Sequence, residues 1–156
     1  MNERPGGNTA LESNLLQRAY AALFARAVLG LIFFMAGVYK VFRLGPLEHA
    51  RKYFLPAADT FLPVWSLWAT GTVVPFVELV AGAMVLLGLF TRTALISLGC
   101  VLALVTFGHL LKQPLYPFHE HVIPRLALVL FLLWIPAESD RFSLDALRRR
   151  LRRDGS

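Results

Sequence analysis

Apolar residues fill four long blocks of this chain, and charged residues lie mainly between and beyond them. Within the blocks apolar residues occur nearly all round a helix, which is typical of helices in lipid. The first three blocks reach the roughly 20 residues that span a bilayer core. The fourth has a clean apolar run of only about 21 Å at 1.5 Å per residue, so it spans only if 117–121 dips into the interface. The pattern predicts an all-α, polytopic membrane protein, a four-transmembrane-helix bundle with helices at about 20–42, 65–90, 93–111 and 118–136.

Polar segments divide the chain into a polar N-terminal tail (1–18), a membrane domain (19–136) and a basic amphipathic C-terminal tail (137–156). The first tail is too polar and too long for an ordinary signal peptide, so we expect the first membrane helix to be retained. A short interfacial helix is predicted in the loop before Pro56. A second is predicted in the C-terminal tail, with Ser143 as its N-cap and an apolar stripe formed by Leu144, Leu147 and Leu151.

Composition agrees with this class, because 56% of the residues are hydrophobic and only 17% are charged. A soluble helical bundle, the rival interpretation, would need polar helix faces that these segments lack. The net charge of +6 does not indicate nucleic-acid binding, because the basic residues gather at membrane edges and in the C-terminal tail. Anionic lipid headgroups are the expected partner of these basic residues.

The distribution of Lys and Arg predicts the orientation. Nine arginines fall in the two tails and the turn after the second helix, whereas five basic residues fall on the opposite side. Since cytoplasmic loops carry an excess of Lys and Arg, both termini are expected in the cytoplasm.

Three charged residues lie inside apolar segments: Arg26, Glu78 and Arg125. Each costs about 2.5 to 3.5 kcal/mol at a helix centre, so each is expected to have a partner or a ligand. Counting helical rise from the membrane edges puts Glu78 and Arg125 level, with His109 slightly above them. We therefore predict one pocket formed by Glu78, Arg125 and His109, with Lys40 at its outer edge and Arg26 below it.

The helical spacing of these residues also places them on helix faces that are expected to point into the bundle. One stripe of the first helix is formed by Arg26, Gly30, Phe33, Gly37 and Lys40, and one of the second helix by Gly71, Pro75, Glu78 and Gly82. Pro75 frees the carbonyl of Gly71, which a polar ligand or side chain could use. The glycines either serve the site or simply allow close helix packing.

One glutamate against two arginines leaves the predicted pocket short of negative charge, which an anion or a polarised oxygen would supply. In the alternative, the arginines snorkel to opposite edges and the arrangement is purely structural. No metal is expected, because the sequence HEH at 119–121 lacks zinc-ligand spacing. The single cysteine, Cys100, allows neither an internal disulfide nor a CxxC redox pair.

Three runs of this chain resemble the DoxX family of small bacterial four-helix membrane proteins. They are RAVLGLIFFMAGVYKVF (26–42), VELVAGAMVLLGLFTRTA (77–94) and FSLDAL (142–147). The strongest features are the R-x3-G-x6-G-x2-K stripe, the glutamate of the second helix, the GLFTR turn and the terminal SLD. The fourth helix departs from the likeness, because it is short and begins with HEHVIPR.

The resemblance implies a four-helix bundle in the bacterial cytoplasmic membrane, associated with quinone-dependent redox systems. The resemblance also implies that Arg26, Lys40, Glu78 and His109 are site residues. Arg125 is included only because of its estimated depth in the membrane. The leading hypothesis is a subunit or accessory protein that binds a quinone or small anion and is not an enzyme by itself. A redox partner subunit and a homo-oligomer are the protein partners considered. A carrier or exporter of a small solute and a ligand-free membrane scaffold remain alternative hypotheses.

Overall fold

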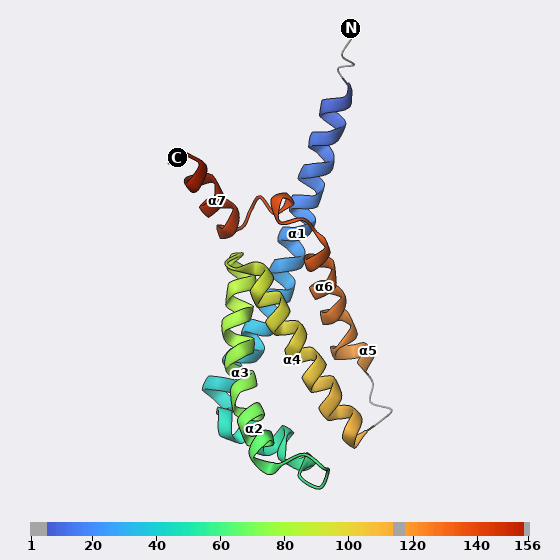
Figure 1. Cartoon of the computed structure of the whole chain (residues 1–156), viewed down its shortest axis with the longest axis vertical. Coiled ribbons are helices and arrows are strands. Elements are labelled where there is room, and N and C mark those ends of the chain that lie inside the picture. Colours follow the sequence, from blue (N-terminus) through green and yellow to red (C-terminus); the bar gives the residue numbers. More distant parts are fainter. Residues whose placement is uncertain (1–5, 114–117, 155–156) are drawn as a thin grey trace.

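All regular elements in the described parts of the computed structural model, residues 6–113 and 118–154, are helices. The long ones run up and down beside one another: α1 (Gly6–Val38), α3 (Val64–Leu87), α4 (Thr91–Lys112) and α6 (Ile123–Trp134) (Figure 1). A π-helical segment, Tyr39–Leu44, continues α1. The shorter helices are α2 (Pro46–Tyr53), α5 (Phe118–His121), α7 (Leu144–Asp154) and the 3-10 turns Leu55–Ala57 and Ala137–Ser139.

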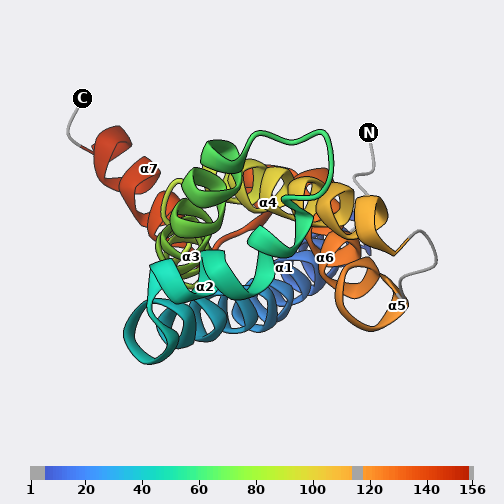
Figure 2. The ribbon, with the colours of Figure 1, turned by 90° about the horizontal axis from the view of Figure 1, so that it is seen from below.

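The two ends of this bundle differ in what covers them. The first turns of α1 and the whole of α7 lie at one end, which we call the terminal end (Figure 1). At the other end, the loop end, α2 packs against α3 and the π-helical segment Tyr39–Leu44 (Figure 2). The short helix predicted before Pro56 is confirmed as α2, and its interfacial position remains a prediction.

Among the described residues, three helices are long and apolar enough to cross a membrane: Glu12–Leu44, Val64–Leu87 and Thr91–Lys112. This confirms the prediction of an all-helical membrane protein. The fourth apolar helix, α6, has 12 residues and a length of only about 18 Å. Large apolar side chains cover the outside of the bundle, as expected where lipid is the solvent; Phe24, Phe42, Trp65 and Trp134 are among the most exposed.

The polar N-terminal segment is helical from Gly6 onward and continues directly into the apolar part of α1. The helix begins at Gly6 and shows no break near residue 18. No glycine or proline occurs between Gly7 and Gly30, so nothing in this stretch interrupts the backbone hydrogen bonds. The helix therefore extends beyond the rest of the bundle at the terminal end (Figure 1).

Glycines bring α1 and α3 into backbone contact. A Cβ built on Gly82 would lie 2.5 Å from the backbone nitrogen of Phe34, and one on Gly30 would lie 2.7 Å from that of Leu86. Gly37 contacts Leu79 in the same way. Since lipid tails are as apolar as the side chains, close packing of this kind is a main force between membrane helices. The side chains buried along this seam and against α4 and α6 include Leu29, Phe33, Val85, Leu98 and Val129.

A substitution at this seam should destabilise the bundle. Gly82→Ala would force the two backbones apart and is expected to lower the stability by about 1 to 3 kcal/mol. The matched control is Gly108→Ala, because a Cβ there has open space and alanine favours a helix over glycine. The midpoint of thermal unfolding in detergent should fall for Gly82→Ala and stay level or rise for Gly108→Ala. Equal midpoints in both variants would contradict the packing argument.

Candidate functional site

Glu78 and Lys40 form an ion pair between α3 and the end of α1. Lys40 Nζ lies 2.5 Å from Glu78 Oε2. The glutamate is only 3% exposed, whereas the lysine side chain is 25% exposed. Both residues lie on the predicted inward stripes. The pair therefore connects a buried carboxylate to the surface of the loop end through one lysine.

His49 of α2 lies in the same part of the bundle and was not anticipated from the sequence. Its ring is 3% exposed and contacts Tyr53 and Phe54. Its Nδ1 is 2.7 Å from the carbonyl oxygen of Gly71, so Nδ1–H donates to that oxygen. This is the carbonyl that Pro75 was predicted to free, and α2 supplies the side chain that uses it.

The surroundings of His49 determine its protonation. Burial lowers the pKa of His49 below its ordinary value of 6.5. The hydrogen bond to Gly71 opposes this shift, the charge of Lys40 adds to it, and the charge of Glu78 opposes it. Burial prevails, so the neutral ring is favoured. With Nδ1–H donating to Gly71, the Nε2 lone pair can accept a proton or a hydrogen bond. We call Lys40, His49, Glu78 and the Gly71 carbonyl the loop-end cluster.

Arg125 and His109 do not join this cluster through a contact with Glu78. The guanidinium of Arg125 lies over the ring of Phe33, 5.7 Å from its centroid, and Phe33 packs opposite Gly82. Arg125 therefore lies about one helical turn, roughly 5 Å, from the level of Glu78 toward the terminal end. His109 Nδ1 donates to the carbonyl of Val105 in its own helix, at 2.7 Å. A ligand role for these two residues remains a prediction.

Arg26 belongs to a different site, at the terminal end. It is 1% exposed, with Nε 3.2 Å from Asp140 Oδ2 and Nη2 donating to the Phe142 carbonyl at 3.1 Å. Arg26 Nη1 makes no hydrogen bond within the described chain. Burial raises the pKa of the Asp140 carboxyl above its ordinary value, and the charge of Arg26 opposes this shift. The sequence argument grouped Arg26 with Glu78, whereas the structure gives it a carboxylate of its own.

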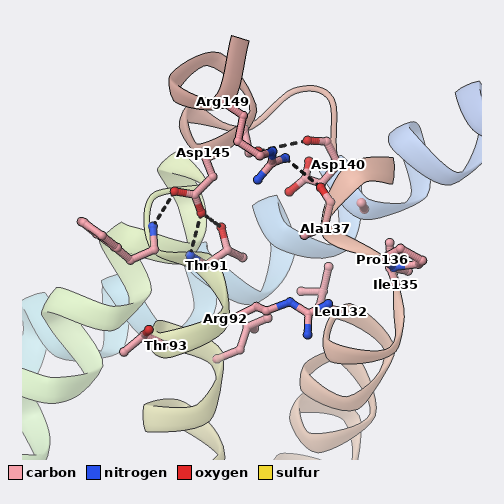
Figure 3. Close-up of a pocket in the computed structure, with 14 residues that line it drawn as sticks. Thr91, Arg92, Thr93, Leu132, Ile135, Pro136, Ala137, Asp140, Asp145 and Arg149 are labelled. Carbon is pink, nitrogen blue, oxygen red and sulfur yellow. Dashed lines mark hydrogen bonds between the residues drawn. The ribbon is translucent and has the colours of Figure 1, made fainter. Parts of the chain in front are cut away.

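The C-terminal segment also binds the turn between α3 and α4. Asp145 accepts hydrogen bonds from the backbone nitrogens of Phe90 and Thr91 and from the Thr91 hydroxyl (Figure 3). These contacts cap the start of α4 from another helix, since α4 has no cap of its own. Gly88 adopts a left-handed conformation (φ 70°), and the space that a Cβ would take is filled by Arg26 and Ser143.

The GLFTR turn (88–92) and the SLD sequence (143–145) therefore contact each other in the folded protein. The SLD also begins α7, because the Ser143 hydroxyl accepts from the backbone nitrogen of Ala146 at 3.1 Å, which confirms the predicted N-cap. Sequence reasoning missed Asp140 and Asp145. The signal that could have found them was the shortage of carboxylates for the buried arginines, combined with acidic residues just beyond the last apolar helix.

Within the described ranges, no three His, Cys, Asp or Glu side chains come together in a way that could hold a metal ion. The side chain of His119 lies outside the described part of the structure.

Comparison with known proteins gives one match. The model of the family described as DoxX matches residues 21–110, which include α1 from residue 21 to its end, α2, α3 and nearly all of α4. No curated protein and no solved structure matches the chain. The matched range contains Arg26 and the whole loop-end cluster, whereas Asp140 and Asp145 follow it.

Protonation of His49 should loosen α2. Because the pKa of His49 is lowered in the folded protein, the folded state binds fewer protons than the unfolded chain. Its stabilising contribution is present above pH 6.5 and is lost as the pH falls through the lowered folded pKa. Hydrogen exchange of the α2 amides, corrected for intrinsic rates, should show less protection at about pH 5 than at about pH 7.5. His49→Gln, which can still donate to Gly71, should abolish this difference; a pH dependence that persists there would assign it to another group.

Proposed function

Since the chain belongs to the DoxX family, a family of membrane proteins, we propose that it binds a quinone headgroup or a small anion at the loop-end cluster. In this proposal it serves as a subunit or accessory protein of a redox system in a bacterial cytoplasmic membrane. It supplies a binding site and a proton-exchanging carboxylate, and a partner subunit carries out the electron transfer.

The proposed topology has four membrane crossings and both termini in the cytoplasm. The up-and-down order of α1, α3, α4 and α6 supports an even number of crossings, because α1 begins and α7 follows α6 at the same end (Figure 1). The 12 residues of α6 are short for a span, but α5 precedes them and lengthens the helical path. The excess of arginines at the terminal end supports the cytoplasmic side.

One observation carries the functional proposal: the carboxylate of Glu78 is buried among apolar helices and paired with a lysine that remains partly exposed. A charge held in this environment is costly and is usually retained for function. The single lysine partner leaves the second carboxylate oxygen, Oε1, without an ion pair in the described structure. A polar ligand entering beside Lys40 would reach both charges.

The cluster has the chemical groups that a quinone site needs. Quinone oxygens accept hydrogen bonds, which the ammonium group of Lys40 can donate. Reduction of a quinone takes up protons, and a buried carboxylate is suited to exchange them. The neutral ring of His49 adds a second proton acceptor close by. Arg125, one turn deeper, would contact a ligand that extends along Phe33.

Neutralising the buried carboxylate should weaken binding. In a titration of the purified protein with a quinol analogue, Glu78→Gln is expected to raise the Kd about tenfold or more, since one hydrogen bond to a charged group contributes about 1.5 to 3 kcal/mol. The control is Glu48→Gln, because Glu48 is exposed and forms only a long pair of 3.9 Å with Arg51. Unchanged affinity in Glu78→Gln, with the thermal midpoint preserved, would overturn the proposal.

The topology can be tested with single cysteines. Cys100→Ser removes the native thiol, and Gln113→Cys, Asn14→Cys and Arg150→Cys each add one. A membrane-impermeant thiol reagent applied to intact cells should label position 113 and reach positions 14 and 150 only after permeabilisation. Labelling of 113 and 150 from the same side would show that α6 does not cross the membrane. Labelling of 14 and 150 from outside would reverse the orientation.

A further inference from the structure

A cavity of about 240 Å³ opens at the terminal end, away from the loop-end cluster. Its walls come from the start of α4, the end of α6 and the C-terminal segment with α7 (Figure 3). One side is apolar, with Leu95, Leu132 and Ile135. The other side carries Arg92 from α4 and Arg149 from α7. In Figure 3 the side chain of Arg92 extends across the cavity toward Leu132.

The acidic residues at this cavity already have partners. Both carboxylate oxygens of Asp145 accept hydrogen bonds from residues at the start of α4. Asp140 Oδ2 pairs with Arg26, whereas Asp140 Oδ1 has no hydrogen-bond partner within the described residues. Arg149 donates to the carbonyl of Ala137 at 2.8 Å, and its charge also acts on the nearby Asp140 carboxylate. Arg92 makes no hydrogen bond or ion pair with any residue that the structure describes. Arg92 is therefore the cationic group at this cavity whose hydrogen-bond donors are left unused by the described residues.

The cavity lies at the depth where lipid headgroups meet the bundle. Trp134, in the α6 segment that lines it, is 80% exposed, and Tyr20 lies half a turn from Ala22, a lining residue of α1. Exposed Trp and Tyr side chains concentrate at the membrane interface. The exposed leucines of α7, Leu144, Leu147 and Leu151, extend the apolar surface beside the arginines. An amphiphilic anion would thus find apolar and cationic walls side by side.

We propose that this cavity binds the phosphate of an anionic phospholipid, held between Arg92 and Arg149, with the start of its acyl chains against Leu132 and Ile135. Arginine donors match phosphate oxygens in pairs, which makes such contacts specific. The bound lipid would bridge α4 and α7 and so add to the contact that Asp145 makes between them. The site is independent of the quinone proposal, because it shares no residue with the loop-end cluster.

The test compares variants that remove equal charge. Purified protein in neutral detergent is titrated with phosphatidylglycerol, and bound lipid is counted by native mass spectrometry. Arg92→Gln is expected to raise the Kd about tenfold, the size of one charge-assisted contact, and Arg92→Gln with Arg149→Gln to abolish the tightest site. The control, Arg150→Gln with Arg152→Gln, removes the same charge from α7 at residues that do not line the cavity.

The outcomes separate this site from diffuse attraction. If the control loses as much affinity as the double cavity variant, the binding is general to the basic tail and the proposal fails. If inorganic phosphate binds as tightly as the lipid, the ligand is a free anion and the lipid assignment fails. Arg92→Gln alone removes no hydrogen bond or ion pair within the described residues, so a folded variant with unchanged lipid affinity would also overturn the proposal.

Discussion

The cost of keeping charge inside an apolar helix bundle governs this structure. Arg26 and Glu78 are almost fully buried, and each has an oppositely charged partner from a distant part of the chain. An isolated ion in such surroundings would be expensive, whereas a paired and hydrogen-bonded one is tolerated. The two pairs lie at opposite ends of the bundle. Each pair therefore fixes how the segment beyond the membrane helices joins its end.

At the terminal end, the charge of Arg26 organises the chain that follows the last apolar helix. Asp140 forms an ion pair with the guanidinium, the carbonyl of Phe142 accepts a hydrogen bond from it, and Asp145 caps the start of α4. The turn between α3 and α4 can accept this segment because Gly88 leaves room for Arg26 and Ser143. The C-terminal segment is thus a structural part of the bundle, and these contacts hold α7 at the terminal end.

At the loop end, a break in the hydrogen bonding of α3 organises the chain before it. Pro75 cannot donate to the carbonyl of Gly71, and the ring of His49 does so instead. The absence of a side chain at Gly71 lets Ala50 of α2 approach its backbone. This contact covers the Lys40 and Glu78 pair with a helix that is itself polar. A buried carboxylate, a partly exposed ammonium group and a neutral imidazole are thereby collected in one place.

The sequence by itself determined the class of protein, the long helices, the inward stripes and the family likeness, because these follow from local apolar pattern and helical spacing. It also predicted the α7 cap at Ser143 and the free carbonyl of Gly71, which are local consequences of residue type. It did not predict that Arg26 pairs with Asp140, that Asp145 caps α4, or that His49 binds Gly71. Those contacts join residues 22 to 114 positions apart, and only the tertiary packing decides which side chains meet. Depth along a helix axis gives the level of a side chain, but rotation and offset between helices are set by where glycines let the backbones touch.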